Sequence, residues 1–266
     1  AKLSRAPSGQ DTVRFLTGDD LAGELVGIDG GLVEFEASLG RTKLDQRRLR
    51  ALSLDPDLAV TPVLPAMRWV AVFRDGSRCT AKQLLPRDDF TLQLIPLTGE
   101  PFFIPWYDVA RLCRFDATLL PLSERAPAEV AYTPFLQGAV DVERNANIQR
   151  QPLSVRGREY VSGIGMTSRM AATYAIEPED EAFRALVALD DLALDKGSVT
   201  FHIDVDGKNV WSSPVINGQS APLPTPVIDL QGKQRFTLRV DFGESGDVAD
   251  IADWCDAQIL RTTKVK

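Results

Sequence analysis

The sequence contains little histidine and no long hydrophobic run. His202 is the single histidine among 266 residues. Histidine is the usual general base at neutral pH and the commonest metal ligand. A zinc site made of several histidines is therefore excluded, and any Ser–His–Asp or Cys–His catalysis would have to use His202. No stretch reaches the roughly 18 apolar residues that a membrane-spanning helix requires, which predicts that the chain does not insert into a membrane.

Basic residues are fewer than acidic ones, 30 against 37, and the net charge is -7. Binding to nucleic acid requires a cluster of basic residues, and so does docking on anionic lipid. The charge therefore argues against both as partners. The apolar fraction of 44% and the charged fraction of 25% are those of an ordinary globular protein.

Cysteine is also scarce, with Cys79, Cys113 and Cys255 as the three examples. Their spacing contains no CxxC pair and no metal-ligand pattern. An odd number leaves at least one thiol free. Cys79 and Cys113 could form a disulfide in an oxidising compartment, or all three could be small core residues.

Prolines gather in residues 55–67 and 117–133. Because proline cannot donate to a β-ladder and breaks helices, both stretches are predicted to be linkers. They divide the sequence into three blocks, 11–54, 67–115 and 140–262.

The first two blocks look like copies of one unit. Each predicts five short strands joined by turns that contain Gly and Asp, and each predicts a helical turn before its last strand, at Gln46–Leu49 and Tyr107–Ala110. A flat sheet this short would leave exposed edges, so a small barrel is favoured. The pattern resembles Sm-like or SH3-like barrels. Neither copy has a basic aromatic face, so we expect spacers or docking elements that do not bind nucleic acid.

The third block predicts many short strands, which is typical of a β-sandwich. Apolar and polar residues alternate along 198–205, and Asp206-Gly207 signals a hairpin turn. His202 then lies on the polar face and is expected to be solvated. Residues 178–184 could form one helical turn. The expected strands are 153–155, 158–161, 172–176, 183–189, 198–205, 208–212, 221–229, 234–241 and 253–260.

Four segments of this block carry a family resemblance. They are Gly157-Arg-Glu-Tyr-Val-Ser-Gly-Ile-Gly, Phe183-Arg-Ala-Leu-Val-Ala-Leu-Asp-Asp, Gly197-Ser-Val-Thr-Phe-His-Ile-Asp-Val-Asp-Gly-Lys and Asp247-Val-Ala-Asp-Ile-Ala-Asp-Trp-Cys-Asp-Ala. In this order they resemble the NPCBM family of carbohydrate-binding modules, related to family 51 modules, over Asn145–Leu260. The resemblance implies a galactose-binding-like jelly roll and a glycan bound by loops at one end. It also implies a periplasmic, secreted or cell-surface location in a bacterium, and it allows a structural Ca²⁺ ion.

Two positions depart from the family pattern. Members usually carry histidine where this chain has Thr167 and Ile251. Losing both imidazoles would remove hydrogen-bonding groups for sugar hydroxyls. An alternative therefore stays open, a structural or protein-interaction module that has lost sugar binding and contacts other surface proteins. A third class, a hydrolase that uses two carboxylates, would need both in one cleft.

Six residues are the candidates for ligand contact. The guanidinium of Arg169 could donate hydrogen bonds to sugar hydroxyls or simply face solvent. The acidic candidates could supply oxygens to Ca²⁺ or accept hydrogen bonds from loop backbone. No catalytic residue is predicted. The candidates are Thr167, Ser168, Arg169, Asp190, Asp250 and Asp253.

Aromatic residues could stack on a sugar, but packing inside the protein is favoured because large rings bury much apolar surface. This applies to Trp254, Trp211 and Tyr160. Trp106 and Tyr107 could be exposed, and joining the second barrel to its neighbour is the preferred interpretation.

The sequence as a whole predicts an all-β chain, with two tandem SH3/Sm-like small barrels followed by a galactose-binding-like jelly-roll β-sandwich. The expected function is non-catalytic binding of a glycan through loops of the C-terminal sandwich. No cofactor is expected beyond the structural Ca²⁺ that the family allows.

Overall fold

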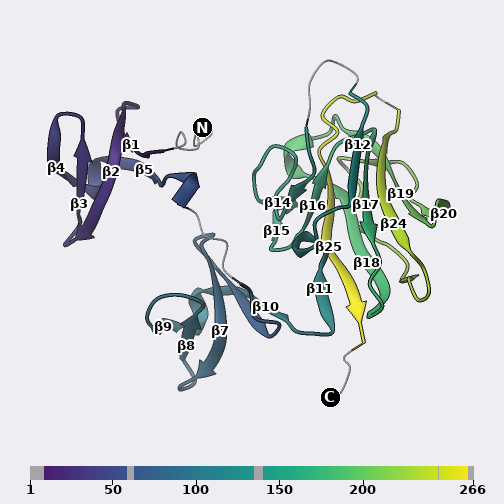
Figure 1. The fold of residues 1–266 in the computed structure, drawn as a ribbon, viewed down its shortest axis with the longest axis horizontal. Helices are drawn as coiled ribbons and strands as arrows, with labels where there is room; N and C mark the ends of the chain where they lie inside the picture. The colour runs from purple at the N-terminus through teal and green to yellow at the C-terminus, as the bar shows by residue number, and fades with distance from the viewer. Residues whose placement is uncertain (1–8, 59–62, 135–139, 245, 263–266) are drawn as a thin grey trace. The chain divides into compact units, whose positions relative to one another are not determined.

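The computed structural model describes residues 9–58, 63–134, 140–244 and 246–262 (Figure 1). Within these ranges the regular elements are strands, apart from five 3-10 turns of three residues each. The all-β prediction is confirmed. Contacts divide the chain into two compact units, 1–63 and 64–266. No helix in the described ranges has the length and hydropathy needed to cross a membrane.

Two five-stranded antiparallel sheets share one strand order. The first sheet, in unit 1, runs β4-β3-β2-β1-β5, and the second sheet, in unit 2, runs β9-β8-β7-β6-β10. A 3-10 turn precedes the last strand of each, as predicted. The elements of the first sheet are β1 (Asp11–Phe15), β2 (Asp20–Asp29), β3 (Leu32–Ala37), β4 (Gly40–Asp45), η1 (Gln46–Arg48) and β5 (Leu49–Ser53), followed by η2 (Pro56–Leu58). Those of the second sheet are β6 (Arg68–Phe73), β7 (Arg78–Pro86), β8 (Thr91–Pro96), β9 (Phe102–Pro105), η3 (Trp106–Asp108) and β10 (Val109–Phe115).

The turn after the first strand repeats in its hydrogen bonding. In the first sheet the N–H of Phe15 donates to the carbonyl of Asp19 at 2.9 Å, and in the second the N–H of Phe73 donates to the carbonyl of Ser77 at 2.9 Å. Matching strand order and matching turns support the interpretation of an internal repeat. Closure of either sheet into an Sm-like or SH3-like barrel stays a prediction.

Two further sheets, both in unit 2, pack face to face as a sandwich. One has the order β13-β16-β25-β18-β22, with β11 against β25 and β23 against β18. The other has the order β12-β17-β24-β19-β20, with β21 against β19. The elements are β11 (Leu119–Pro121), η4 (Leu122–Glu124), β12 (Glu129–Tyr132), β13 (Glu143–Arg144), β14 (Leu153–Val155), β15 (Arg158–Tyr160), β16 (Gly163–Met166), β17 (Met170–Ala175), β18 (Asp180–Leu189), η5 (Asp191–Ala193), β19 (Ser198–Val205), β20 (Lys208–Ser212), β21 (Ile216–Asn217), β22 (Leu223–Pro224), β23 (Ile228–Asp229), β24 (Arg235–Phe242) and β25 (Ala252–Arg261).

The core of the sandwich follows from strand alternation. Val199, Phe201 and Ile203 of β19 point inward and are fully buried, as their spacing of two residues predicts. Trp254 is fully buried as well, and its ring meets that of Phe201 edge-on, with 5.1 Å between centroids. Trp211 is half-buried and packs against the same core. The prediction that Trp254 is a core residue is confirmed.

The predicted linker at 117–133 is wrong. Leu119–Pro121 pairs with β25, and Glu129–Tyr132 pairs with β17. Leu122 between them is fully buried in the sandwich core. Proline is tolerated here because Pro121 ends its strand and because Pro127 and Pro134 lie outside β12, one on either side of it. The helical turn expected at 178–184 is also wrong, because β18 begins at Asp180. The three predicted domain ranges stay predictions.

Cys79 and Cys113 are free thiols, as is Cys255. Cys79 lies opposite Ala71 of β6, and Cys113 lies opposite Val70 on the other side of that strand. Neighbouring residues of a strand point to opposite faces, so the two thiols lie on opposite faces and two strands apart. That separation is about 10 Å, beyond the roughly 7 Å limit for a disulfide.

The second sheet packs on the sandwich through arginines. Arg78 Nη2 donates to Glu159 Oε2 at 2.7 Å, and Arg111 Nη1 donates to the backbone carbonyl of Glu159. The guanidinium of Arg111 also lies over the ring of Tyr160, 5.8 Å from its centroid. The preferred interpretation, that Trp106 and Tyr107 join the second sheet to its neighbour, is not supported by their contacts. Trp106 packs against the second sheet's own core, and Tyr107 is 70% exposed.

Candidate functional site

Three loops meet at one end of the sandwich, which we name the loop end. They are 167–169 between β16 and β17, 190–197 between β18 and β19, and the described residues 243–244 and 246–251 between β24 and β25. Met166 at the end of β16 pairs with Ala252 at the start of β25, and the end of β18 pairs there too. The register of the strands therefore brings all six candidate residues to one end of the fold.

Asp250 and Ser168 lie side by side there, both 3% exposed. Asp250 Oδ1 accepts a hydrogen bond from the N–H of Ser198 at 3.0 Å. Burial raises the pKa of Asp250 by more than its interactions with the Ser198 N–H and the Ser168 hydroxyl lower it. This carboxyl group ties the loop before β25 to the start of β19.

Asp253 and Asp190 form a second buried pair. Asp253 is fully buried on the outer face of its sheet, the face covered by β14 and β15. Burial, followed by the charge of Asp190 beside it, raises the pKa of the Asp253 carboxyl well above its usual range. Asp190 accepts hydrogen bonds from the N–H of Leu192 at 2.9 Å and from the N–H of Ser154 at 3.0 Å. Burial thus disfavours the charged form of Asp253, and Asp190 caps a turn.

Asp191 fixes the turn between β14 and β15. Its carboxylate accepts hydrogen bonds from the N–H of Arg156 at 2.6 Å, the N–H of Gly157 at 2.9 Å and the hydroxyl of Ser154 at 2.6 Å. Burial acts to raise the pKa of Asp191, but these hydrogen bonds together lower it.

Asp190, Asp191 and Asp250 thus accept hydrogen bonds from loop backbone N–H groups, which is one of the two roles expected for the acidic residues. Within the described ranges, no group of three or more His, Cys, Asp or Glu side chains is arranged to hold a metal ion. The carboxylate oxygens of Asp190 and Asp191 already accept hydrogen bonds from backbone N–H groups. These hydrogen bonds occupy part of the acceptor capacity of both carboxylates, whereas Ca²⁺ takes six to eight oxygens from carboxylates, carbonyls and water. A structural Ca²⁺ ion stays a prediction.

The loop end presents a mixed polar and aliphatic surface. Arg169 is exposed and Thr167 is half-buried, so these two of the six candidates can reach a ligand. On the other two loops the sequence reasoning missed two aliphatic side chains, Leu194 at 66% exposed and Val248 at 54% exposed. Leu194 has a φ of 54°, a strained conformation for a leucine. No sequence pattern signalled it.

The two departures from the family pattern lie in different surroundings. Thr167 is on the loop end, whereas Ile251 is 4% exposed and belongs to the sandwich core. The single histidine is elsewhere, on the outer face of β19. His202 is hydrogen-bonded to the hydroxyls of Thr200 at 3.0 Å and Ser212 at 2.8 Å. Burial and then Arg239 lower the pKa of His202, so it is neutral at pH 7.

Comparison with known solved structures finds several modules of similar arrangement. A CBM51 module of Clostridium perfringens GH95 in complex with methyl-galactose is 21% identical, with a TM-score of 0.48 over 53% of this chain and 99% of that one. A Clostridium perfringens ZmpB fragment, described as CBM51-2 in complex with GlcNAc and INT domains, is 16% identical. Its TM-score is 0.49 over 90% of this chain and 46% of that one.

Sequence comparison gives a firmer relation. A protein of Renibacterium salmoninarum named as an endo-alpha-N-acetylgalactosaminidase is 28% identical over 114 residues, which are 43% of this chain and 8% of that protein. The chain therefore spans a small part of that relative. A model of the NPCBM/NEW2 domain matches residues 126–260, just over half of the chain, and includes the loop end. The chain belongs to the NPCBM/NEW2 domain family.

Proposed function

We propose that the chain is a non-catalytic carbohydrate-binding protein that holds a glycan at the loop end, at a bacterial cell surface or in the periplasm. The observation that carries the proposal is the family match over 126–260, which contains the strands that build this end. The modules in complex with methyl-galactose and GlcNAc supply the first sugars to try.

The surface of the loop end suits a sugar. A guanidinium such as that of Arg169 presents five N–H donors in a fixed fork, which can serve neighbouring hydroxyls of one ring. The exposed aliphatic side chains of Leu194 and Val248, on the other two loops, offer apolar surface to the C–H groups of a glycan. Carbohydrate and other small-ligand sites combine apolar surface with a few polar groups in this way.

The buried acids support binding without hydrolysis. A glycosidase needs two carboxyl groups on either side of the scissile bond. At the loop end, Asp190, Asp250 and Asp253 are each 3% exposed or less, and Asp190 and Asp250 accept hydrogen bonds from backbone N–H groups. These groups hold loops together and do not face a substrate.

The test is a calorimetric titration of the full chain with methyl-galactose and with GlcNAc, with and without calcium. Arg169→Ala is expected to weaken binding about tenfold, since a hydrogen bond from a charged donor contributes roughly 1.5 kcal/mol or more. Arg235→Ala is the matched control, because Arg235 is exposed at the opposite end of the sandwich. Equal effects of both substitutions, or release of reducing sugar from a glycan, would contradict the proposal.

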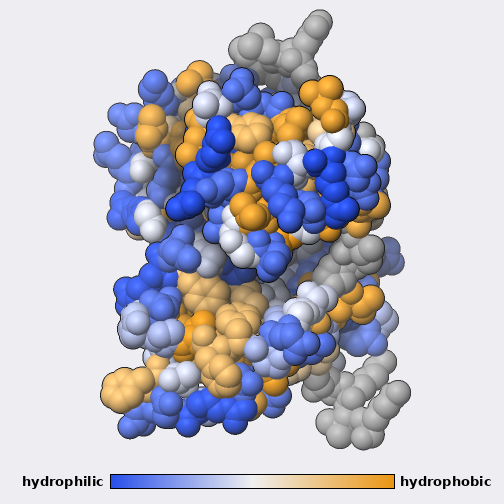
Figure 2. Space-filling view, turned by 90° about the vertical axis from the view of Figure 1, so that its left-hand side faces the viewer, coloured by the Kyte–Doolittle hydropathy of each residue, from blue (hydrophilic) through white to orange (hydrophobic). Residues whose placement is uncertain are grey.

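A second candidate, protein interaction, rests on the second sheet. Its surface carries exposed phenylalanines, Phe90 at 77% and Phe103 at 61%. Figure 2 shows apolar side chains gathered in the lower half of that view. Beside them, a groove of about 380 Å³ is lined by residues that include Phe73, Phe102 and Ile104. Exposed apolar patches of this kind often mark interaction surfaces. Capture of one specific surface protein that is lost in Phe103→Ser would favour this function.

A further inference from the structure

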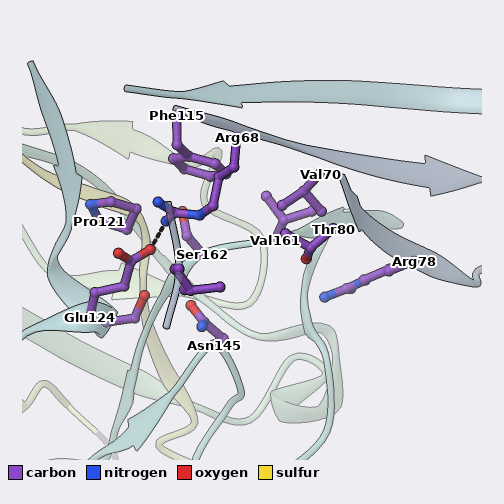
Figure 3. Close-up of a pocket in the computed structure, with 12 residues that line it drawn as sticks. Arg68, Val70, Arg78, Thr80, Phe115, Pro121, Glu124, Asn145, Val161 and Ser162 are labelled. Atoms are coloured by element: carbon purple, nitrogen blue, oxygen red, sulfur yellow. Dashed lines mark hydrogen bonds and ion pairs between the residues drawn. The ribbon is translucent and has the colours of Figure 1, made fainter. Parts of the chain in front are cut away.

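A separate pocket lies inside unit 2, between the second sheet and the sandwich (Figure 3). Its volume is about 180 Å³, well above the roughly 10–15 Å³ of such space that one water molecule needs. Val161 and Ser162 form part of its sandwich side and precede β16, whereas the loop end follows β16. The pocket and the loop end are therefore different sites.

The charged wall of the pocket is Arg68, whose side chain is 6% exposed. Its guanidinium forms an ion pair with Glu124, donates to the carbonyl of Pro65 at 3.2 Å and lies over the ring of Phe115, 4.9 Å from the centroid. These three contacts hold the guanidinium of Arg68 in place. Figure 3 shows Arg68, Phe115 and Glu124 grouped along one side of the pocket. A guanidinium has five N–H donors, so this group retains donors beyond the two that these contacts use.

Neutral polar groups line the rest of the pocket. Ser123 is 5% exposed, and its hydroxyl has no hydrogen-bond partner among the residues that the structure describes. A buried hydroxyl without a partner costs free energy, and a serine hydroxyl can turn among three rotamers without moving the backbone. Thr80 of β7 and Asn145 after β13 add a hydroxyl and an amide from opposite walls.

The charges of the pocket are balanced. Arg68 is paired with Glu124, and Arg78 at the rim is paired with Glu159 at 2.7 Å. An anionic ligand would have to compete with these carboxylates, and an unpaired cation would be buried at a high cost. A neutral ligand with many hydroxyls can accept hydrogen bonds from the guanidinium of Arg68 and at the same time donate hydrogen bonds to the carboxylate of Glu124. Val70 and Val161 offer apolar contact to its C–H groups.

From this arrangement we infer that the pocket between the second sheet and the sandwich is a second binding site, which takes one neutral, hydroxyl-rich sugar ring. Arg68 and Glu124 recognise hydroxyls, and Ser123, Thr80 and Asn145 complete the polar shell. The inference rests on the proposed function in the class of ligand, but not in the residues that bind it. The second sheet then supplies one wall of a sugar site, through Arg68, Val70 and Thr80.

The test uses the full chain, with methyl-galactose and GlcNAc as probes, followed by calorimetry and by backbone amide shifts in NMR. Thr80→Val and Ser123→Ala each remove one hydroxyl with little change of volume. Each is expected to weaken one class of binding about fivefold, since a neutral hydrogen bond contributes about 1 kcal/mol. Thr42→Val, a half-buried threonine of the first sheet, is the matched control and should leave both classes unchanged.

The outcomes separate the two sites. Two classes of binding, one weakened by Ser123→Ala and Thr80→Val and the other by Arg169→Ala, support both proposals. A single class weakened by the pocket variants supports the pocket and overturns the loop end. A single class weakened only by Arg169→Ala overturns the pocket inference, as does a pocket whose amide shifts stay constant while sugar is added. Loss of all sugar binding in the wild-type chain overturns both.

Discussion

Replacing Asp253 by asparagine is expected to remove a loss in the free energy of unfolding that the wild-type chain suffers as the pH rises. The Asp253 carboxyl is fully buried beside Asp190, and its pKa is raised well above the ordinary value by burial and by that neighbour. The folded protein therefore disfavours ionisation of this group, while in the unfolded chain it ionises near pH 3.9. Asparagine has the same shape, stays neutral at every pH and can donate an N–H to Asp190 in place of the carboxyl proton.

The sign and the size follow from proton linkage. Below the unfolded pKa both states are protonated, and the group makes its full contribution to stability. As the pH rises above about 4, unfolding releases the proton, and the wild-type chain loses about 1.4 kcal/mol of stability per pH unit until its folded pKa is reached. The D253N variant has no such loss, because its side-chain amide does not ionise. Burial raises the pKa values of Asp250 and Asp256 as well, but both residues are present in the two proteins, so their effects cancel in the difference.

The assay is urea unfolding followed by tryptophan fluorescence, at several pH values from 4 to 7. The free energy of unfolding of D253N minus that of the wild type should rise with pH at up to about 1.4 kcal/mol per unit. Asp89→Asn, at an exposed turn position, is the matched control and should give a flat difference. A flat or falling difference for D253N would show that Asp253 is ionised in the folded state, and the reasoning would be refuted.

Three other predictions test the packing of the chain. Trp254→Ala should cost the sandwich about 3–5 kcal/mol, as large-to-small core substitutions do, because the side chain is fully buried against Phe201; a loss below about 1 kcal/mol in urea unfolding would contradict this. Gly197→Ala should lower the melting temperature clearly, since a Cβ there would lie 2.5 Å from the carbonyl oxygen of Ala249. Gly27→Ala is the control and should have little effect, because a Cβ there would meet nothing within 4 Å. Reducing agent should leave the melting temperature unchanged, because Cys79 and Cys113 lie on opposite faces of their sheet; a drop on reduction would reveal a disulfide.

Local patterns in the sequence predicted most of the sandwich. The alternation along 198–205 gave β19 with the bounds that the structure has, and Asp206-Gly207 gave the hairpin to β20. These signals are local, because a strand with one buried face must repeat every two residues. The same reasoning failed at 117–133, where prolines suggested a linker. In the structure this segment pairs with β17 and β25. Both strands are distant in sequence, so a local pattern contains no information about the pairing.

The candidate site shows the same division. The family resemblance implied that Thr167, Arg169, Asp190, Asp250 and Asp253 lie near a ligand, and the strand register brings them to one end of the sandwich. Their contact with a ligand stays a prediction. The sequence could not separate the exposed Arg169 from the buried acids, because burial depends on which loops close over each side chain. It also gave no sign of Leu194, whose exposure and positive φ arise from how its loop packs.

The sequence by itself determined the all-β class, the family and the absence of a multi-histidine site, since composition, strand period and motif order are properties of the chain. The tertiary structure decided which polar groups meet. It buried Asp190 and Asp250 as acceptors for loop backbone N–H groups, placed the single histidine between two hydroxyls, and brought Arg68 and Ser123 to one pocket. The contacts of Asp250 with Ser198 and of Arg68 with Glu124 join residues that are far apart along the chain, and only folding fixes their distance.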